Sequence, residues 1–201
     1  DINDIQPGAM NPFTFLKKVG QNGEEVPIDT ATLMTIIQLL CGKLDNQIIV
    51  DITPIVTDFV TKSKNSDEYV DMQDVADYLF ANASPAAHTV GTLLKMYEDN
   101  KYGQLLFTRE TDVEPLVLSP TDSMVISLHG LQLPDYNKKA EDYDASERLT
   151  STILFLITII LTISMPSRCY FTLSQFNALV LIDSSSSSMA MLMVALTLPL
   201  T

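Results

Sequence analysis

The sequence predicts a mixed α/β fold in which a helical insertion of about four helices packs beside a partial parallel sheet. Four helix signals follow one another between residues 30 and 100. After residue 101 the pattern changes to short apolar runs, one long apolar stretch and a final run typical of a buried strand. A helical part joined to a piece of α/β sheet is the simplest architecture with this order of elements.

Composition and charge narrow the class of protein. The chain has 201 residues, of which 46% are apolar, and this is enough for a sizeable core. The formal net charge is −13, which disfavours direct binding to the phosphate backbone of nucleic acids. Cys41 and Cys169 are too few for a disulfide framework, so we expect buried thiols and a reducing, cytoplasmic environment.

The four helices are indicated mainly by their first residues. Residues 1–29 contain many turn formers and are expected to be loop and short extended pieces. Asp29 or Thr30 caps the first helix, which Gly42 ends. The remaining three helices are expected to begin at Thr53-Pro54, Asp71 and Ser84-Pro85.

The part after residue 101 is expected to contribute strands and one long helix. Short strands are predicted at Leu105–Phe107, Glu114–Val117 and Met124–Leu128, and Pro134–Ala145 is expected to be a solvated acidic loop. Leu149–Met165 has no charged residue and favours a buried crossover helix. The alternative is a membrane span in a small anchored protein, because spans begin near this length.

Asp183 is the candidate site residue. It follows a run of apolar residues, 178–182, that is typical of a buried strand ending in an acid, the pattern of a Walker B strand. An acid at the carboxyl end of a parallel strand can hold the Mg²⁺ that bridges nucleotide phosphates. The alternative is a purely structural strand end.

Several elements of a nucleotide hydrolase are missing from the sequence. It contains no G-x-x-x-x-G-K-[ST] loop, and Gly42-Lys43 is followed by Leu44. Ser184 stands where such enzymes have a glutamate that orients water. The isolated His88 and His129 do not indicate a metal site. We therefore expect no catalytic residue, and no tight nucleotide binding, in this chain alone.

A succession of loose motifs resembles the conjugative-transfer, or type IV secretion, ATPases. The motifs are Asn11-Pro12-Phe13, a helical insertion, Gly103 to Phe107, Met124 to Leu131, Glu147-Arg148 and the strand that ends at Asp183. Their order is similar to that of the family's RecA-like motor domain, with its all-helical insertion. This resemblance covers roughly residues 5–183, and the chain begins with Asp1 rather than Met, so we expect an interior fragment.

The resemblance implies a division of the chain and a function. Residues 1–29 would lead in from the ATPase core, 30–100 would be the insertion, 101–183 a partial nucleotide-binding core, and 184–201 a low-complexity tail. The full-length protein would bind ATP and Mg²⁺, with Asp183 on the metal, and would form a hexamer with other secretion proteins at the cytoplasmic face of the membrane. The alternative function is an acidic helical interaction module without enzymatic activity.

Overall fold

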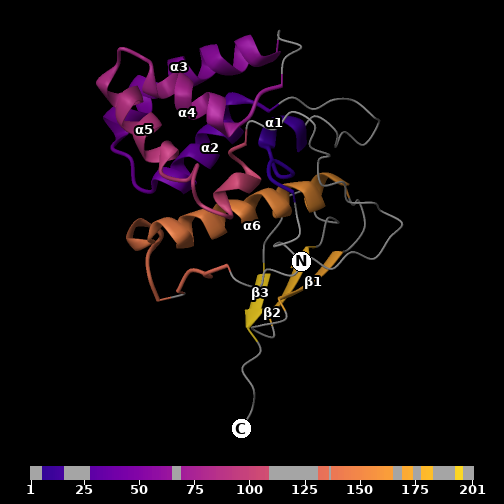
Figure 1. The fold of residues 1–201 in the computed structure, drawn as a ribbon. Helices are drawn as coiled ribbons and strands as arrows, with labels where there is room; N and C mark the ends of the chain where they lie inside the picture. The colour runs from indigo at the N-terminus through magenta and orange to yellow at the C-terminus, as the bar shows by residue number, and fades with distance from the viewer. Residues whose placement is uncertain are drawn as a thin grey trace.

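A computed structural model describes most of the helical part of the chain and three short strands. The described residues are 6–15, 28–64, 69–108, 131–135, 137–164, 169–173, 178–182 and 193–196. Figure 1 shows the helices of the first half gathered into one body, with a long helix running beneath them. The helices are α1 Pro12–Phe15, α2 Thr30–Cys41, α3 Asn46–Lys64, α4 Met72–Phe80, α5 Pro85–Lys95 and α6 Ala145–Ser164, with the 3-10 turns η3 Gly103–Leu105 and η4 Ala140–Asp142.

Three helices begin where their capping residues predict. Asp29 accepts the backbone N–H of Thr32 at 2.7 Å at the start of α2, and Ser84 caps α5. Asp71 forms a capping box with Asp74 at the start of α4. These caps are local, because each side chain satisfies a backbone donor in the first turn of its own helix.

The predicted start of α3 is wrong. The helix begins at Asn46 and continues through Pro54, which lies inside it. The hydroxyl of Thr53 donates to the carbonyl of Ile49 at 2.6 Å instead of capping a new helix. Ile52, upstream of the proline, is fully buried in the core. Burial of this extra apolar turn therefore outweighs the backbone hydrogen bond that proline cannot make.

The strand predicted at Leu105–Phe107 is also wrong. The 3-10 turn η3 occupies its beginning, and the three side chains are buried in the helical core. The strands predicted at Glu114–Val117 and Met124–Leu128 lie outside the described residues. Three consecutive apolar residues fit a buried turn as well as a buried strand, so the sequence pattern could not separate the two.

The long apolar stretch forms a helix that packs against α2. Leu149, Ile153 and Leu156 are buried at i, i+4 and i+7, which places them on one face of α6. Among the residues that the structure describes, no helix combines the length and apolar character needed to cross a membrane. The observed burial of this face follows from its contact with the helical body.

The predicted fold class, mixed α/β with a partial parallel sheet, is wrong. The described part is predominantly helical, and its strands β1 Cys169–Leu173, β2 Ala178–Ile182 and β3 Met193–Leu196 form an antiparallel sheet in the order β1-β2-β3. Only four residues separate β1 from β2. Parallel neighbours need a crossover of a dozen or more residues, so this spacing permits only the antiparallel pairing.

The segment that contains Asn11-Pro12-Phe13 is part of the helical body. Met10 is fully buried, and its N–H donates to the carbonyl of Leu105 at 3.1 Å. The Asn11 side chain donates to the carbonyl of Val70 at 2.8 Å and accepts the N–H of Phe13 at 3.1 Å. This motif therefore ties the beginning of the chain to the start of α4 and to η3.

Candidate functional site

The C-terminal end of α2 is held by side chains from two distant helices. The Tyr97 hydroxyl donates to the carbonyl of Leu40 at 2.7 Å, and Arg148 on α6 donates to the carbonyl of Cys41 at 3.2 Å. The N–H of Gly42 donates to the carbonyl of Gln38 at 2.9 Å. Three of the last four helix carbonyls, which have no partner within a helix, are thus satisfied.

Gly42 allows the chain to leave α2 directly beneath Arg148. Its φ of 76° and ψ of −146° lie in a region that is essentially restricted to glycine. A Cβ at this position would lie 2.5 Å from the guanidinium carbon of Arg148. Gly42, which the sequence marked only as a helix stop, is therefore also the surface against which Arg148 packs.

Burial suppresses ionisation of two groups near this helix end. The Cys41 thiol is free and buried, and burial raises its pKa to about 12 against the opposing effect of the Arg148 charge. Burial likewise raises the pKa of Tyr97 to about 12. Both groups are therefore neutral at physiological pH, and Cys41 has the character of a structural thiol rather than a nucleophile.

The beginning of α6 is organised by a buried glutamate. Glu147 accepts the N–H of Asp144 at 2.9 Å, and Asp144 accepts the N–H of Glu147 at 2.9 Å, the reciprocal pattern of a capping box. Both carboxylate oxygens of Glu147 also lie 2.9 Å from the ammonium of Lys138. The side chain of Glu147 is only 2% exposed. Glu147 therefore fixes the acidic loop against α6.

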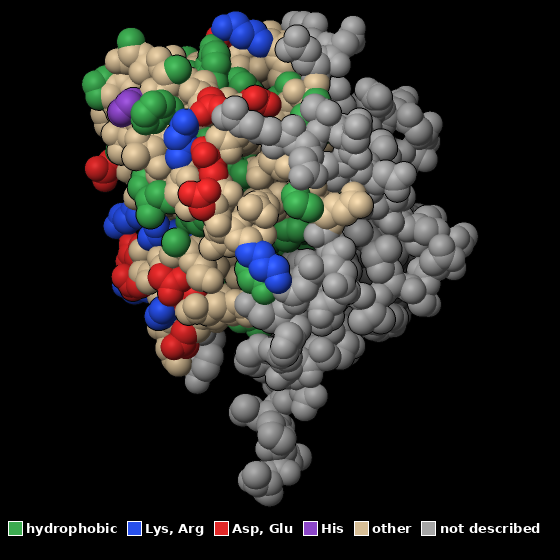
Figure 2. Space-filling model, in the orientation of Figure 1, with side chains coloured by type: hydrophobic (Ala, Val, Ile, Leu, Met, Phe, Trp, Pro, Cys, Tyr) green, Lys and Arg blue, Asp and Glu red, His purple; other side chains and the backbone are tan. Residues whose placement is uncertain are grey.

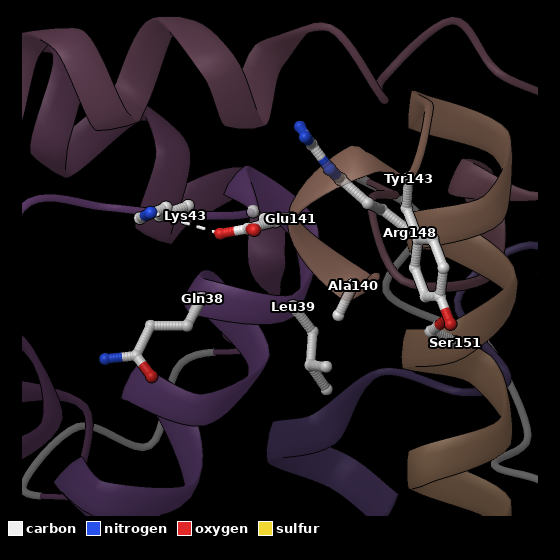
Figure 3. Close-up of a pocket in the computed structure, with 9 residues that line it drawn as sticks. Gln38, Leu39, Lys43, Ala140, Glu141, Tyr143, Arg148 and Ser151 are labelled. Atoms are coloured by element: carbon white, nitrogen blue, oxygen red, sulfur yellow. Dashed lines mark hydrogen bonds and ion pairs between the residues drawn. The ribbon is translucent and has the colours of Figure 1, made fainter. Parts of the chain in front are cut away.

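A pocket of about 250 Å³ lies between these two helix ends. It is lined by Gln38, Leu39, Gly42, Lys43, Ala140, Glu141, Tyr143, Arg148 and Ser151. Figure 3 shows Lys43, which follows the end of α2, facing Glu141 of η4, and their charged atoms are 3.1 Å apart. The pocket therefore has one ion pair at its edge and the side chains of Leu39, Ala140 and Tyr143 around it.

Two polar side chains of this pocket bond to the backbone. Arg148 donates through one guanidinium nitrogen to the carbonyl of Cys41, while its buried Nε has no hydrogen-bond partner, and the Ser151 hydroxyl donates to the carbonyl of Glu147 at 2.9 Å. The described residues contain no cluster of three or more histidine, cysteine, aspartate or glutamate side chains suited to a metal ion.

Asp183, the predicted metal and nucleotide ligand, lies outside the described residues. It comes directly after Ile182, the last residue of β2. The strand from 178 to 182 is confirmed, but both of its neighbours run antiparallel to it. The role of Asp183 stays a prediction.

The other residues considered from the sequence have identifiable surroundings where they are described. His88 Nδ1 lies 2.7 Å from the carbonyl of Phe80, and the two rings are tilted by 31° with centroids 4.4 Å apart. His88 thus contacts the end of α4, while His129 and Ser184 lie outside the described residues.

The pocket was not found by sequence reasoning. Its residues come from two segments about 100 positions apart in the chain, 38–43 and 140–151. The available signal was that Glu147 and Arg148 follow a capping aspartate, Asp144. No local pattern indicates that this helix start meets the end of α2.

Comparison with known proteins gives one family. The model of the AAA-like domain matches residues 3–188, which is most of the chain. No significant match was found among curated proteins or among solved structures. The matched range includes the helical body, the pocket and Asp183. The chain therefore belongs to the AAA-like domain family and is related to the P-loop ATPases.

Proposed function

We propose that this chain is part of a motor ATPase of conjugative transfer or type IV secretion. The observation that carries the proposal is the match to the AAA-like domain over residues 3–188. The succession of motifs from Asn11 to Asp183 supports the assignment to a transfer motor within that family. The motor would couple ATP hydrolysis to the transfer of DNA or protein.

The proposal assigns a role to Asp183. Asp183 holds the Mg²⁺ that accompanies the nucleotide phosphates, which is the role of an acid at the end of a Walker B strand. The sequence contains no phosphate-binding loop, so this chain alone does not bind ATP tightly. We further propose a hexamer that works with secretion proteins at the cytoplasmic face of the membrane and does not touch nucleic acid through this piece.

Calorimetric titration with Mg–ATP tests the proposal. The chain is compared with a version that includes whatever native sequence its gene encodes before Asp1, and each is also made as Asp183→Asn. We expect binding only by the longer version, weakened about tenfold or more by Asp183→Asn in the presence of Mg²⁺. Equal Mg–ATP affinity with and without the substitution would contradict the role of Asp183. No binding by the longer version would contradict the motor assignment.

A second candidate function is an acidic helical interaction module. It is favoured by the helical core, whose buried apolar residues extend from Met10 to Ile157, and by the net charge of −13. The module predicts that residues 6–164 form a monomer that melts cooperatively in circular dichroism. A helical signal lost gradually on heating, with no transition, would count against it.

A further inference from the structure

A buried carboxylate at the start of α4 holds a segment that lies far along the chain. The Asp71 side chain is 1% exposed, and its Oδ1 accepts the N–H groups of Gln73 at 2.7 Å and of Asp74 at 3.1 Å. Its Oδ2 accepts the N–H of Thr108 at 3.2 Å. We propose that Asp71 is a pH-sensitive latch, which holds Thr108 against α4 while its carboxyl group is neutral and loosens this contact when the group is ionised. This inference goes beyond the proposed function and does not depend on it.

The surroundings of Asp71 provide no cation among the residues that the structure describes. Figure 2 shows acidic and basic side chains interspersed at the surface on the face in view, whereas Asp71 is buried and takes part in none of the ion pairs between described residues. Residues 8–13 and 103–108, which bond to each other and to the start of α4, contain no charged side chain. From α4 itself the carboxylate of Asp74 accepts the N–H of Asp71 at 3.0 Å. Ionisation of Asp71 therefore adds a buried negative charge beside a second acid.

The other titratable groups of the neighbouring elements do not neutralise this charge. Tyr69 lies just before α4, and its pKa is raised by burial and, to a smaller extent, by the charge of Asp71, so its hydroxyl is neutral at physiological pH. The remaining ionic contacts between α3, α4 and α5 involve residues of the second half of α4: Asp58 and Lys62 with Tyr78, and Asp77 with Lys95.

The direction of the latch follows from the balance of these effects. Burial, and with it the charge of Asp74, raises the pKa of Asp71 to about 6 against the backbone N–H groups that favour its charged form. Opening of the contact with Thr108 admits water, so the pKa returns toward its ordinary value of about 3.9. A group whose pKa is raised in the closed form stabilises that form at low pH and loses this effect as pH rises. Opening is therefore easier above about pH 6 than below it.

Amide hydrogen exchange of the full chain, followed by nuclear magnetic resonance, tests the latch. Protection factors are corrected for the pH dependence of exchange in a free peptide and compared at about pH 5 and about pH 7. The factor of the Thr108 N–H is expected to fall about tenfold, the ratio that pKa values of about 6 when closed and about 3.9 when open give. A factor that stays constant, or that rises with pH, would overturn the proposal.

Low concentrations of urea separate opening of the latch from unfolding of the whole protein. Ile37 is fully buried in the middle of α2, so its N–H reports on global unfolding, which exposes much surface and depends steeply on urea. Opening at Thr108 exposes little surface, so its protection factor is expected to be lower than that of Ile37 and nearly independent of urea. Equal factors with equal urea dependence at the two amides would show that Thr108 opens only when the protein unfolds.

A matched pair of variants assigns the effect to one carboxylate. Asp71→Asn keeps an oxygen acceptor for the first turn of α4 but does not titrate, so the protection factor of Thr108 is expected to be the same at both pH values. Asp29 caps α2, and its pKa is lowered, first by the N–H of Thr32, so Asp29→Asn is expected to leave the tenfold change at Thr108 intact. A pH dependence that survives in Asp71→Asn would assign the change to another group and overturn the latch.

The unchanged protein provides a second measurement if Asp71→Asn does not fold. The carboxyl carbon of Asp71, labelled with a magnetic isotope, is expected to titrate with a midpoint of about pH 6, and the Thr108 protection factor is expected to change over the same range. A carboxyl carbon that titrates with no change at Thr108, or that shows no midpoint near pH 6, would contradict the proposal.

Discussion

At Gly91 the backbone of α4 lies directly against α5. A Cβ at this position would lie 2.7 Å from the Cα of Phe80 and 2.9 Å from the carbonyl oxygen of Ala76. Both atoms belong to the backbone of α4, so no side chain can rotate to make room. Glycine is the only residue that permits this approach of the two helices.

Gly91→Ala is therefore expected to destabilise the protein although alanine favours helix. Overpacking of a close backbone contact costs about 1–3 kcal/mol, against roughly 1 kcal/mol gained from helix propensity. Urea unfolding measures the difference, with the exposed Thr92→Ala on the same helix as the control. An increase in stability for Gly91→Ala would show that the two helices can move apart freely.

Two capping carboxylates respond to pH in opposite directions. Burial raises the pKa of Asp71 to about 6, although backbone donors including Asp74 and Gln73 favour its charged form. The backbone N–H of Asp144, and then Lys138, lower the pKa of Glu147. A raised pKa in the folded state stabilises at low pH, and a lowered pKa stabilises at high pH.

These directions predict the pH profiles of Asp71→Asn and Glu147→Gln. The stability of the native protein relative to Asp71→Asn is expected to fall as pH rises from about 4 to about 6. Its stability relative to Glu147→Gln is expected to be full above about pH 4.3 and to fall as pH drops further. Denaturant unfolding at several pH values measures the two stability differences. Profiles that change in the same direction with pH for the two variants would contradict the opposite pKa shifts of Asp71 and Glu147.

At the scale of a helix, Pro54 is the residue of α3 with the lowest helix propensity. It lies inside α3 and cannot donate to the carbonyl of Val50, whose side chain is 65% exposed. Pro54→Ala is expected to raise the unfolding free energy by about 1–3 kcal/mol, because alanine restores the backbone N–H donor and has a higher helix propensity than proline.

Pro85→Ala is the matched control for Pro54→Ala. Pro85 occupies the first turn of α5, where its missing N–H has no helical partner, so a change near zero is expected. Thermal unfolding of the two variants measures the contrast. A loss of stability for Pro54→Ala would show that α3 needs the bend that proline imposes.

Helix starts were predictable from the sequence to the extent that their capping was local. Asp29, Asp71 and Ser84 each accept backbone N–H groups within three residues, so their roles as caps follow from the neighbouring sequence. Thr53-Pro54 gave the same signal, yet the buried Ile52 upstream decided the outcome. The sequence alone could not weigh a capping signal against burial in a core whose other members were unknown.

At the scale of the whole molecule, the features that failed prediction are those that depend on distant partners. The pocket exists only where residue 43 meets residue 141, and the start of α3 depends on the burial of Ile52 in a core built from distant segments. The resemblance did identify a family that the comparison confirms in its coarser form, the AAA-like domain. The order of motifs can be seen in the sequence without any knowledge of the three-dimensional contacts. The contacts between distant segments cannot be deduced from that order.

Met10 links the beginning of the chain to the stability of the whole helical body. It is fully buried among residues that lie far along the sequence, and its N–H bonds to Leu105. Met10→Ala is expected to cost about 2–5 kcal/mol through the lost burial and the cavity. Calorimetric melting measures it, with the exposed Met96→Ala expected to change stability little. Equal effects would place Met10 outside the cooperative core.

The two side chains that complete the end of α2 have a consequence for the order of folding. Tyr97 and Arg148 lie 57 and 107 residues beyond the carbonyls they bond. During synthesis α2 is therefore made long before its last turn can be completed, and this turn frays until α6 docks. In a pulse of hydrogen exchange during refolding, amides in the middle of α2 should gain protection first, and the N–H of Gly42 should gain it together with α6.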